Sequence, residues 1–129
     1  IETARAFASW TLTVHFKDQG VREYEEGFLL ADVPVGEGGI DLPAVIKVIR
    51  EKKPRVQFHL KLITRDPLKI PYLKDAYWAT LNELKAPRLG GTLAMLKARA
   101  SRNEFPLVSK MSAAEQVREE RENIERSFS

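Results

Sequence analysis

The sequence of 129 residues contains no cysteine, which excludes disulfide bonds, cysteine-ligated metals and a cysteine nucleophile. It also lacks any apolar run of about 18 residues, so no membrane-spanning helix is predicted and no membrane partner is expected. We expect no secretory signal at its start. These absences are typical of a cytoplasmic protein, which is the location we expect.

A dominant charge of one sign is also missing. The 21 Lys and Arg residues face 18 Asp and Glu residues, which leaves a net charge of +3. Proteins that bind nucleic acid usually concentrate their basic residues on one face, whereas here they are dispersed among acidic ones. Nucleic acid is therefore not an expected partner. A hydrophobic content of 43% is ordinary for a single globular domain.

Two short segments, residues 12–18 and 56–63, alternate between apolar and polar side chains, which predicts β-strands. A helix is predicted between them, with Asp41 as its N-cap, Pro43 in its first turn and its end before Pro54. A strand, a helix of about a dozen residues and a second strand form a βαβ unit, which requires parallel strands.

The polar faces of the two strands carry the side chains of interest. His15 and Lys17 share one face of the first strand, and Gln57, His59 and Lys61 share one face of the second. Such a face is either solvated, as in an ordinary antiparallel sheet, or it lines the interior of a barrel enzyme at the end where the active site lies. The repeated polarity and the helical crossover favour the barrel interior.

The remaining segments are predicted from local signals. Residues 19–39 are predicted as a long loop, and helices are expected from about residue 72 onwards, over 72–84, over 90–101 and after Ser112. Ser112 and Glu115 have the spacing of a capping box, so we expect the last helix to begin there. Its many charges predict a solvated face with ion pairs one turn apart.

The length of the chain does not suit a complete barrel. Two parallel strands cannot form a buried sheet by themselves, and a full (β/α)8 barrel takes about 250 residues. The chain is therefore predicted to be the C-terminal part of a barrel whose first strands are missing, or to assemble with another chain; a homo-oligomer is left open.

Three segments then indicate a family. His15-Phe-Lys-Asp18, the Val-Pro-Val-Gly-Glu-Gly of residues 33–38 and the Ile-Thr-Arg-Asp-Pro-Leu of residues 63–68 resemble the C-terminal part of sugar phosphate isomerases/epimerases. These belong to the xylose isomerase-like TIM barrel superfamily. The resemblance implies an α/β fold, in which residues 1–129 supply about strands 7 and 8 of a (β/α)8 barrel followed by C-terminal helices from about residue 72.

The resemblance also implies a function in carbohydrate metabolism. Family members use a divalent metal such as Mn²⁺, Mg²⁺ or Zn²⁺ to assist proton transfer on a sugar, a sugar phosphate or a related hydroxy-ketone. It places His15 as a metal ligand. Lys17 and Asp18 lie at the catalytic end of the implied barrel and Arg65 in the loop after the last strand, so they are interpreted as substrate-binding residues, with structural ion pairs as the alternative. Related DNA repair enzymes need a multi-metal cluster rich in histidine and carboxylates, so that activity is the least favoured.

Lys61 departs from the family pattern, which has a metal-binding Glu at this place. An ammonium group contributes a positive charge and no lone pair, so it opposes a metal ion. Lys61 therefore indicates either a catalytic role, as a Schiff-base nucleophile or as the group that holds an anionic substrate, or a homologue that only binds a sugar or an anion. His59 is interpreted as a packed residue of the barrel core.

Overall fold

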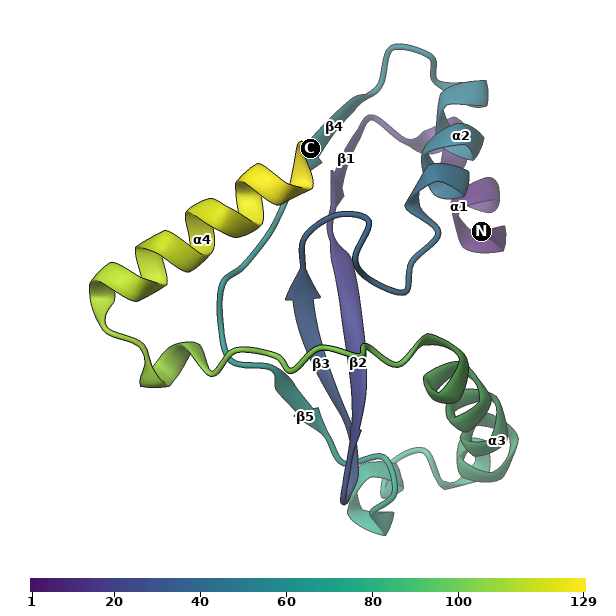
Figure 1. The fold of residues 1–129 in the computed structure, drawn as a ribbon. Helices are drawn as coiled ribbons and strands as arrows, with labels where there is room; N and C mark the ends of the chain where they lie inside the picture. Colours follow the sequence, from purple (N-terminus) through teal and green to yellow (C-terminus); the bar gives the residue numbers. More distant parts are fainter.

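A computed structural model describes the backbone of residues 1–129 and all side chains except those of residues 82, 86 and 87. Its five strands divide into two small sheets (Figure 1). The parallel sheet pairs β1 (Thr13–Phe16) with β4 (Gln57–Leu60), and the antiparallel sheet has the order β2 (Asp18–Tyr24), β3 (Gly27–Val33), β5 (Leu68–Ile70).

The predicted parallel pairing and the helix between the two strands are confirmed: β1 and β4 run parallel, and α2 (Leu42–Lys52) precedes β4. The connection is not a simple βαβ unit, because β2 and β3 also lie between β1 and α2. The Asp41 carboxylate accepts the backbone N–H of Ala44 at 3.1 Å, which satisfies one free donor at the start of α2. The short helices α1 (Glu2–Phe7) and η1 (Ala8–Trp10) pack against α2.

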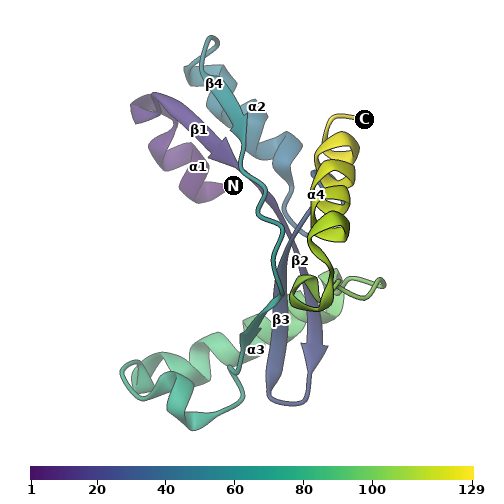
Figure 2. The same cartoon turned by 90° about the vertical axis from the view of Figure 1, so that its left-hand side faces the viewer.

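The segment predicted as a long loop is instead largely a β-hairpin. Tyr24 pairs with Gly27, so Glu25 and Glu26 alone form the turn between β2 and β3. The alternation of β2 is interrupted by Gly20 and by charged residues near the turn, which hides a strand whose pairing is set by β3. Figure 2 shows the hairpin extending from the parallel sheet toward α3.

The predicted barrel portion is wrong. In a barrel, β1 and β4 would continue one closed sheet; here Lys17 alone separates β1 from β2, which belongs to the second, antiparallel sheet. The polar face of the parallel pair is exposed instead of lining an interior, as His15 and His59 show. The chain is a small mixed α/β protein whose described strands do not close.

The helices after residue 70 differ in part from the prediction. Only η2 (Asp75–Trp78) forms within 72–81, and the single helix α3 (Asn82–Arg99) spans the break predicted before Pro87. The last helix, α4 (Ala113–Ser127), begins after η3 (Val108–Lys110) at the predicted capping box, in which Ser112 and Glu115 bond reciprocally.

A small core joins the hairpin to α3. Val21, Tyr72, Trp78 and Leu96 are buried against one another, and the Trp78 Nε1–H donates to the Tyr72 carbonyl at 2.7 Å. None of the helices among the described residues combines the length and the apolar character needed to cross a bilayer.

Candidate functional site

The two histidines lie side by side on the parallel sheet. His15 and His59 are register partners, and their ring centroids are 5.3 Å apart with the ring planes at 64°. Both side chains are exposed, so His59 is not a packed core residue as predicted. The register follows from the crossover through α2, which brings the two alternating segments into phase.

Lys61 and Arg65 lie beyond the end of β4. The backbone N–H of Lys61 donates to the Phe16 carbonyl at 2.9 Å, which extends the ladder by one bond. By alternation Lys61 shares the polar face of His59, and its side chain is exposed. No ion pair among the described side chains includes Lys61 or Arg65. Both cations therefore face solvent.

The metal that the resemblance implies needs more ligands than this face offers. His15 and His59 provide two imidazoles, but the other side chains of the face belong to Thr13, Gln57 and Lys61. The described residues contain no group of three His, Asp or Glu side chains that could hold a metal ion. The donor set of this chain thus does not fit the implied metal site, and we assign no step to a metal.

Lys17 is turned away from the histidines toward the hairpin. Its Nζ lies 2.8 and 3.1 Å from the two carboxylate oxygens of Asp32 on β3. The Asp32 side chain is 1% exposed and also accepts from the Gln19 amide at 3.2 Å. A buried carboxylate needs such a partner, so the structure gives Lys17 the role of neutralising Asp32.

Asp18 holds the loop that follows β3. Its carboxylate is fully buried and accepts four backbone N–H groups, those of Gln19, Gly36, Gly38 and Ile40, at 2.9 to 3.3 Å. A bundle of N–H groups around one carboxylate replaces the water that the anion loses on burial. The structure thus places Asp18 beneath the loop as its anchor, with no oxygen exposed to a substrate.

Asp66, beside Arg65, anchors the segment before α4. Its Oδ1 accepts the backbone N–H of Ser109 at 2.8 Å. Hydrogen bonds from the side chain and the backbone of Ser109 lower the pKa of Asp66 below its usual value. This long-range contact fixes η3 against the end of the loop that follows β4.

A polar cleft of about 950 Å³ lies between the hairpin, the loop after β3, residues 99–107 and α4. Residues 99–103 are held there because the Ser101 N–H donates to the Val21 carbonyl at 2.7 Å, next to a bridge between Val21 and Ala100. The Phe105 ring fits against Gly20, where a Cβ would lie 2.9 Å from it. The volume is within the range of small-molecule sites.

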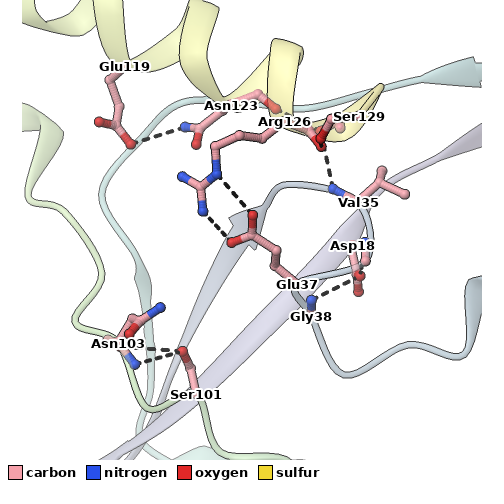
Figure 3. A network of polar contacts seen from close by, with 12 residues as sticks. Asp18, Val35, Glu37, Gly38, Ser101, Asn103, Glu119, Asn123, Arg126 and Ser129 are labelled. Atoms are coloured by element: carbon pink, nitrogen blue, oxygen red, sulfur yellow. Dashed lines mark hydrogen bonds and ion pairs between the residues drawn. The ribbon is translucent and has the colours of Figure 1, made fainter.

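α4 closes one side of the cleft through a polar network (Figure 3). The Arg126 guanidinium forms a two-point ion pair with the Glu37 carboxylate. Ser127 Oγ accepts the Val35 N–H at 3.1 Å. The buried Asn123 donates through Nδ2 to Glu119 at 3.2 Å, and both line the cleft. The inward side of α4 therefore presents hydrogen-bonding groups.

The charges that line the cleft are unevenly compensated. The acids Asp32, Glu37 and Glu104 each pair with a cation, whereas Glu119 accepts a hydrogen bond from the Asn123 amide and forms no ion pair with the side chains that the structure describes. Arg99 donates to the Gly39 carbonyl, and Arg102 takes part in no ion pair of the described side chains. Among the described side chains, two guanidinium groups without a carboxylate partner and one carboxylate without a cation thus line the same cleft.

None of the predicted site residues lines this cleft; Lys17 reaches it only through Asp32. The structure brings His15, His59 and Lys61 onto one exposed face and leaves Arg65 apart in the following loop. Sequence reasoning missed the cleft. The sequence features that could have indicated the cleft are two arginines around Ser101 and the pair Glu119 and Asn123, which are one helical turn apart. Neither feature is specific for a binding site.

No family model, curated protein or solved structure matches this chain.

Proposed function

We propose that the protein binds a sugar phosphate in the polar cleft. The observation that carries the proposal is the separation of charge across it. Among the described side chains, Arg99 and Arg102 form no ion pair, and both line the cleft. Figure 3 shows Ser101 and Asn103, of the segment that holds Arg102, apart from Glu119 and Asn123 on α4. One end of the cleft therefore attracts an anion, and the other offers hydrogen-bonding groups.

The chemistry of the two walls suits the two ends of such a ligand. Guanidinium groups bind phosphate through paired, charge-assisted hydrogen bonds. A carboxylate accepts hydrogen bonds from sugar hydroxyls, and an amide both donates and accepts them. The resemblance to sugar phosphate isomerases/epimerases supports the same class of ligand.

The test is titration of the purified chain with glucose 6-phosphate, followed by calorimetry. Arg102→Ala should weaken binding at least tenfold, because it removes a charge-assisted contact to the phosphate. Arg55→Ala is the matched control, since Arg55 is exposed and does not line the cleft. It should leave the affinity unchanged.

Separate titrations with glucose and with inorganic phosphate show which end of the cleft binds the sugar and which binds the phosphate. Arg102→Ala should weaken binding of phosphate, and Glu119→Gln should weaken binding of glucose. Equal affinities of the native chain and Arg102→Ala for glucose 6-phosphate would refute the proposed site.

Isomerisation or epimerisation of the bound sugar phosphate is a second candidate function. It is favoured because Glu119 is, among the described residues that line the cleft, the carboxylate without a cationic partner. Its carboxylate would take the proton from the carbon beside the substrate carbonyl, leaving an enediolate. Return of the proton to the neighbouring carbon, with a proton moving from one enediol oxygen to the other, gives the isomer, whereas protonation of the same carbon from the opposite face, by solvent, gives the epimer.

Proton exchange with solvent tests this second function directly. In D₂O, NMR should show deuterium entering the substrate at the carbon beside the carbonyl with the native chain. Glu119→Gln should abolish this exchange, whereas Glu120→Gln, on the exposed side of the same helix, should retain it. Exchange that persists in Glu119→Gln would show that Glu119 is not the base.

A further inference from the structure

The polarity of α4 is inverted relative to an ordinary surface helix. Its inward side is polar: Asn123 is 9% exposed, and Glu119 and Ser127 are half-buried. Its apolar side chains point outward, with Val117 59% exposed, and Phe128, the C-cap residue that follows the helix, is 76% exposed. A helix on the surface of a globular protein normally turns its apolar stripe to the core. The outward stripe of α4 therefore lacks the cover that such stripes have.

The apolar residues form one continuous stripe. Val117, Ile124 and Phe128 are separated by seven and four residues, which places them on the same side of a helix. The side chains along this stripe are those of Val117, Glu120, Arg121, Ile124 and Glu125, all on the outer surface of α4. Figure 1 shows α4 along one edge of the molecule.

We propose that the outer stripe of α4 packs antiparallel against α4 of a second copy of this chain. A two-fold axis that passes near Glu122 would place the apolar stripe of one helix against the apolar stripe of the other. In that arrangement Val117 faces Phe128 of the second copy, and the aliphatic stem of Arg121 covers Ile124 of the second copy. Each contact occurs twice, as a two-fold interface requires.

The flanking charges match in the same alignment. Arg118 and Glu125 lie on one flank of the stripe, one helical heptad apart. Antiparallel pairing brings this flank of one helix against the same flank of the other, so that Arg118 approaches Glu125 of the second copy. Within its own helix Arg118 forms a 4.0 Å contact with Glu122 and interacts electrostatically with Glu115, and the side chains of Arg118 and Glu122 are more than half exposed. Arg118 is therefore available to the partner.

Sedimentation of the full chain over a range of concentrations tests the proposal. The native chain should reach twice the mass of the monomer, and Ile124→Asp should raise the dissociation constant at least tenfold. Circular dichroism should show an unchanged helix content, because Ile124 has no described partner in the core. A native chain that remains monomeric at its highest attainable concentration would overturn the proposal.

Charge reversal tests the alignment itself. Arg118→Glu and Glu125→Arg should each weaken the dimer, since like charges then meet twice across the two-fold axis. An equimolar mixture of the two variants should recover a heterodimer, because opposite charges meet again at both places. Glu51→Arg, on the exposed side of α2, is the control and should change nothing. A mixture no larger than its components would rule out this pairing.

Discussion

Replacing Asp18 by alanine is expected to lower the free energy of unfolding by about 4 kcal/mol. The carboxylate is fully buried and accepts four backbone N–H groups. Each buried donor left without an acceptor costs about 1 to 3 kcal/mol. The expected total is below the sum of four such losses, because the freed loop can turn some of its N–H groups toward water.

Urea unfolding followed by tryptophan fluorescence measures this effect. Trp78 is buried in the core and Trp10 is 81% exposed, so a Trp10→Phe background isolates the signal of the core. Asp41→Ala is the matched control, because Asp41 is an exposed aspartate with a single backbone donor. It should cost only about 1 kcal/mol. Equal losses for the two variants would show that the buried network contributes little.

Loss of the hydrogen bonds to Asp18 should also change the wall of the cleft. Pro34, Glu37 and Gly38 form part of its wall, and Asp18 holds Gly38 through its N–H at 3.0 Å. The Glu37–Arg126 ion pair joins the same loop to α4. The anchor, the loop and the helix are therefore one structural unit, and its geometry depends on a carboxylate that does not itself line the cleft.

Local signals in the sequence predicted the elements that are set by local physics. The N-cap at Asp41 and the capping box at Ser112 and Glu115 were found where expected, since each depends on residues within one turn. The parallel pairing of β1 and β4 also followed, because their alternation and the helix between them leave few other arrangements.

The arrangement of the sheets depends on contacts that no local pattern contains. β2 is a strand because β3 pairs with it and because Val21 enters a core formed with Leu96, 75 residues later. The expectation of a barrel interpreted the polar face of His15 and His59 as an interior, whereas the hairpin that starts at Asp18 diverts the chain into a separate sheet. Polarity of a strand alone does not decide which face is covered.

The cleft could not be predicted from the sequence, because it too depends on contacts between distant segments. Its walls come from four segments between Gly20 and Arg126, so no spacing in the sequence connects them. Asp18 was expected to bind substrate because it follows a strand; its actual role depends on N–H groups about 20 residues later in the chain. A buried carboxylate and a catalytic one have the same signature in a sequence, and burial distinguishes them.

Replacing Gly27 by alanine is expected to destabilise the protein by about 3 kcal/mol. An added Cβ would lie 2.1 Å from the Ile70 carbonyl oxygen and 2.8 Å from the Tyr72 nitrogen, both backbone atoms. Backbone in a paired strand cannot rotate aside as a flexible side chain does, so β5 would have to separate from β3. Tyr72 is 3% exposed and accepts from Trp78, so this shift would enter the core.

Gly91→Ala is a control that should change the stability of the protein in the opposite direction. It lies within α3, and an added Cβ there would meet no described atom within 4 Å. Alanine should therefore stabilise the helix by about 0.5 to 1 kcal/mol, because it restricts the unfolded chain. Urea midpoints that move in opposite directions for Gly27→Ala and Gly91→Ala would place the cost at the contact between β3 and β5. A Gly27→Ala variant as stable as the native chain would mean that β5 does not pack closely against Gly27.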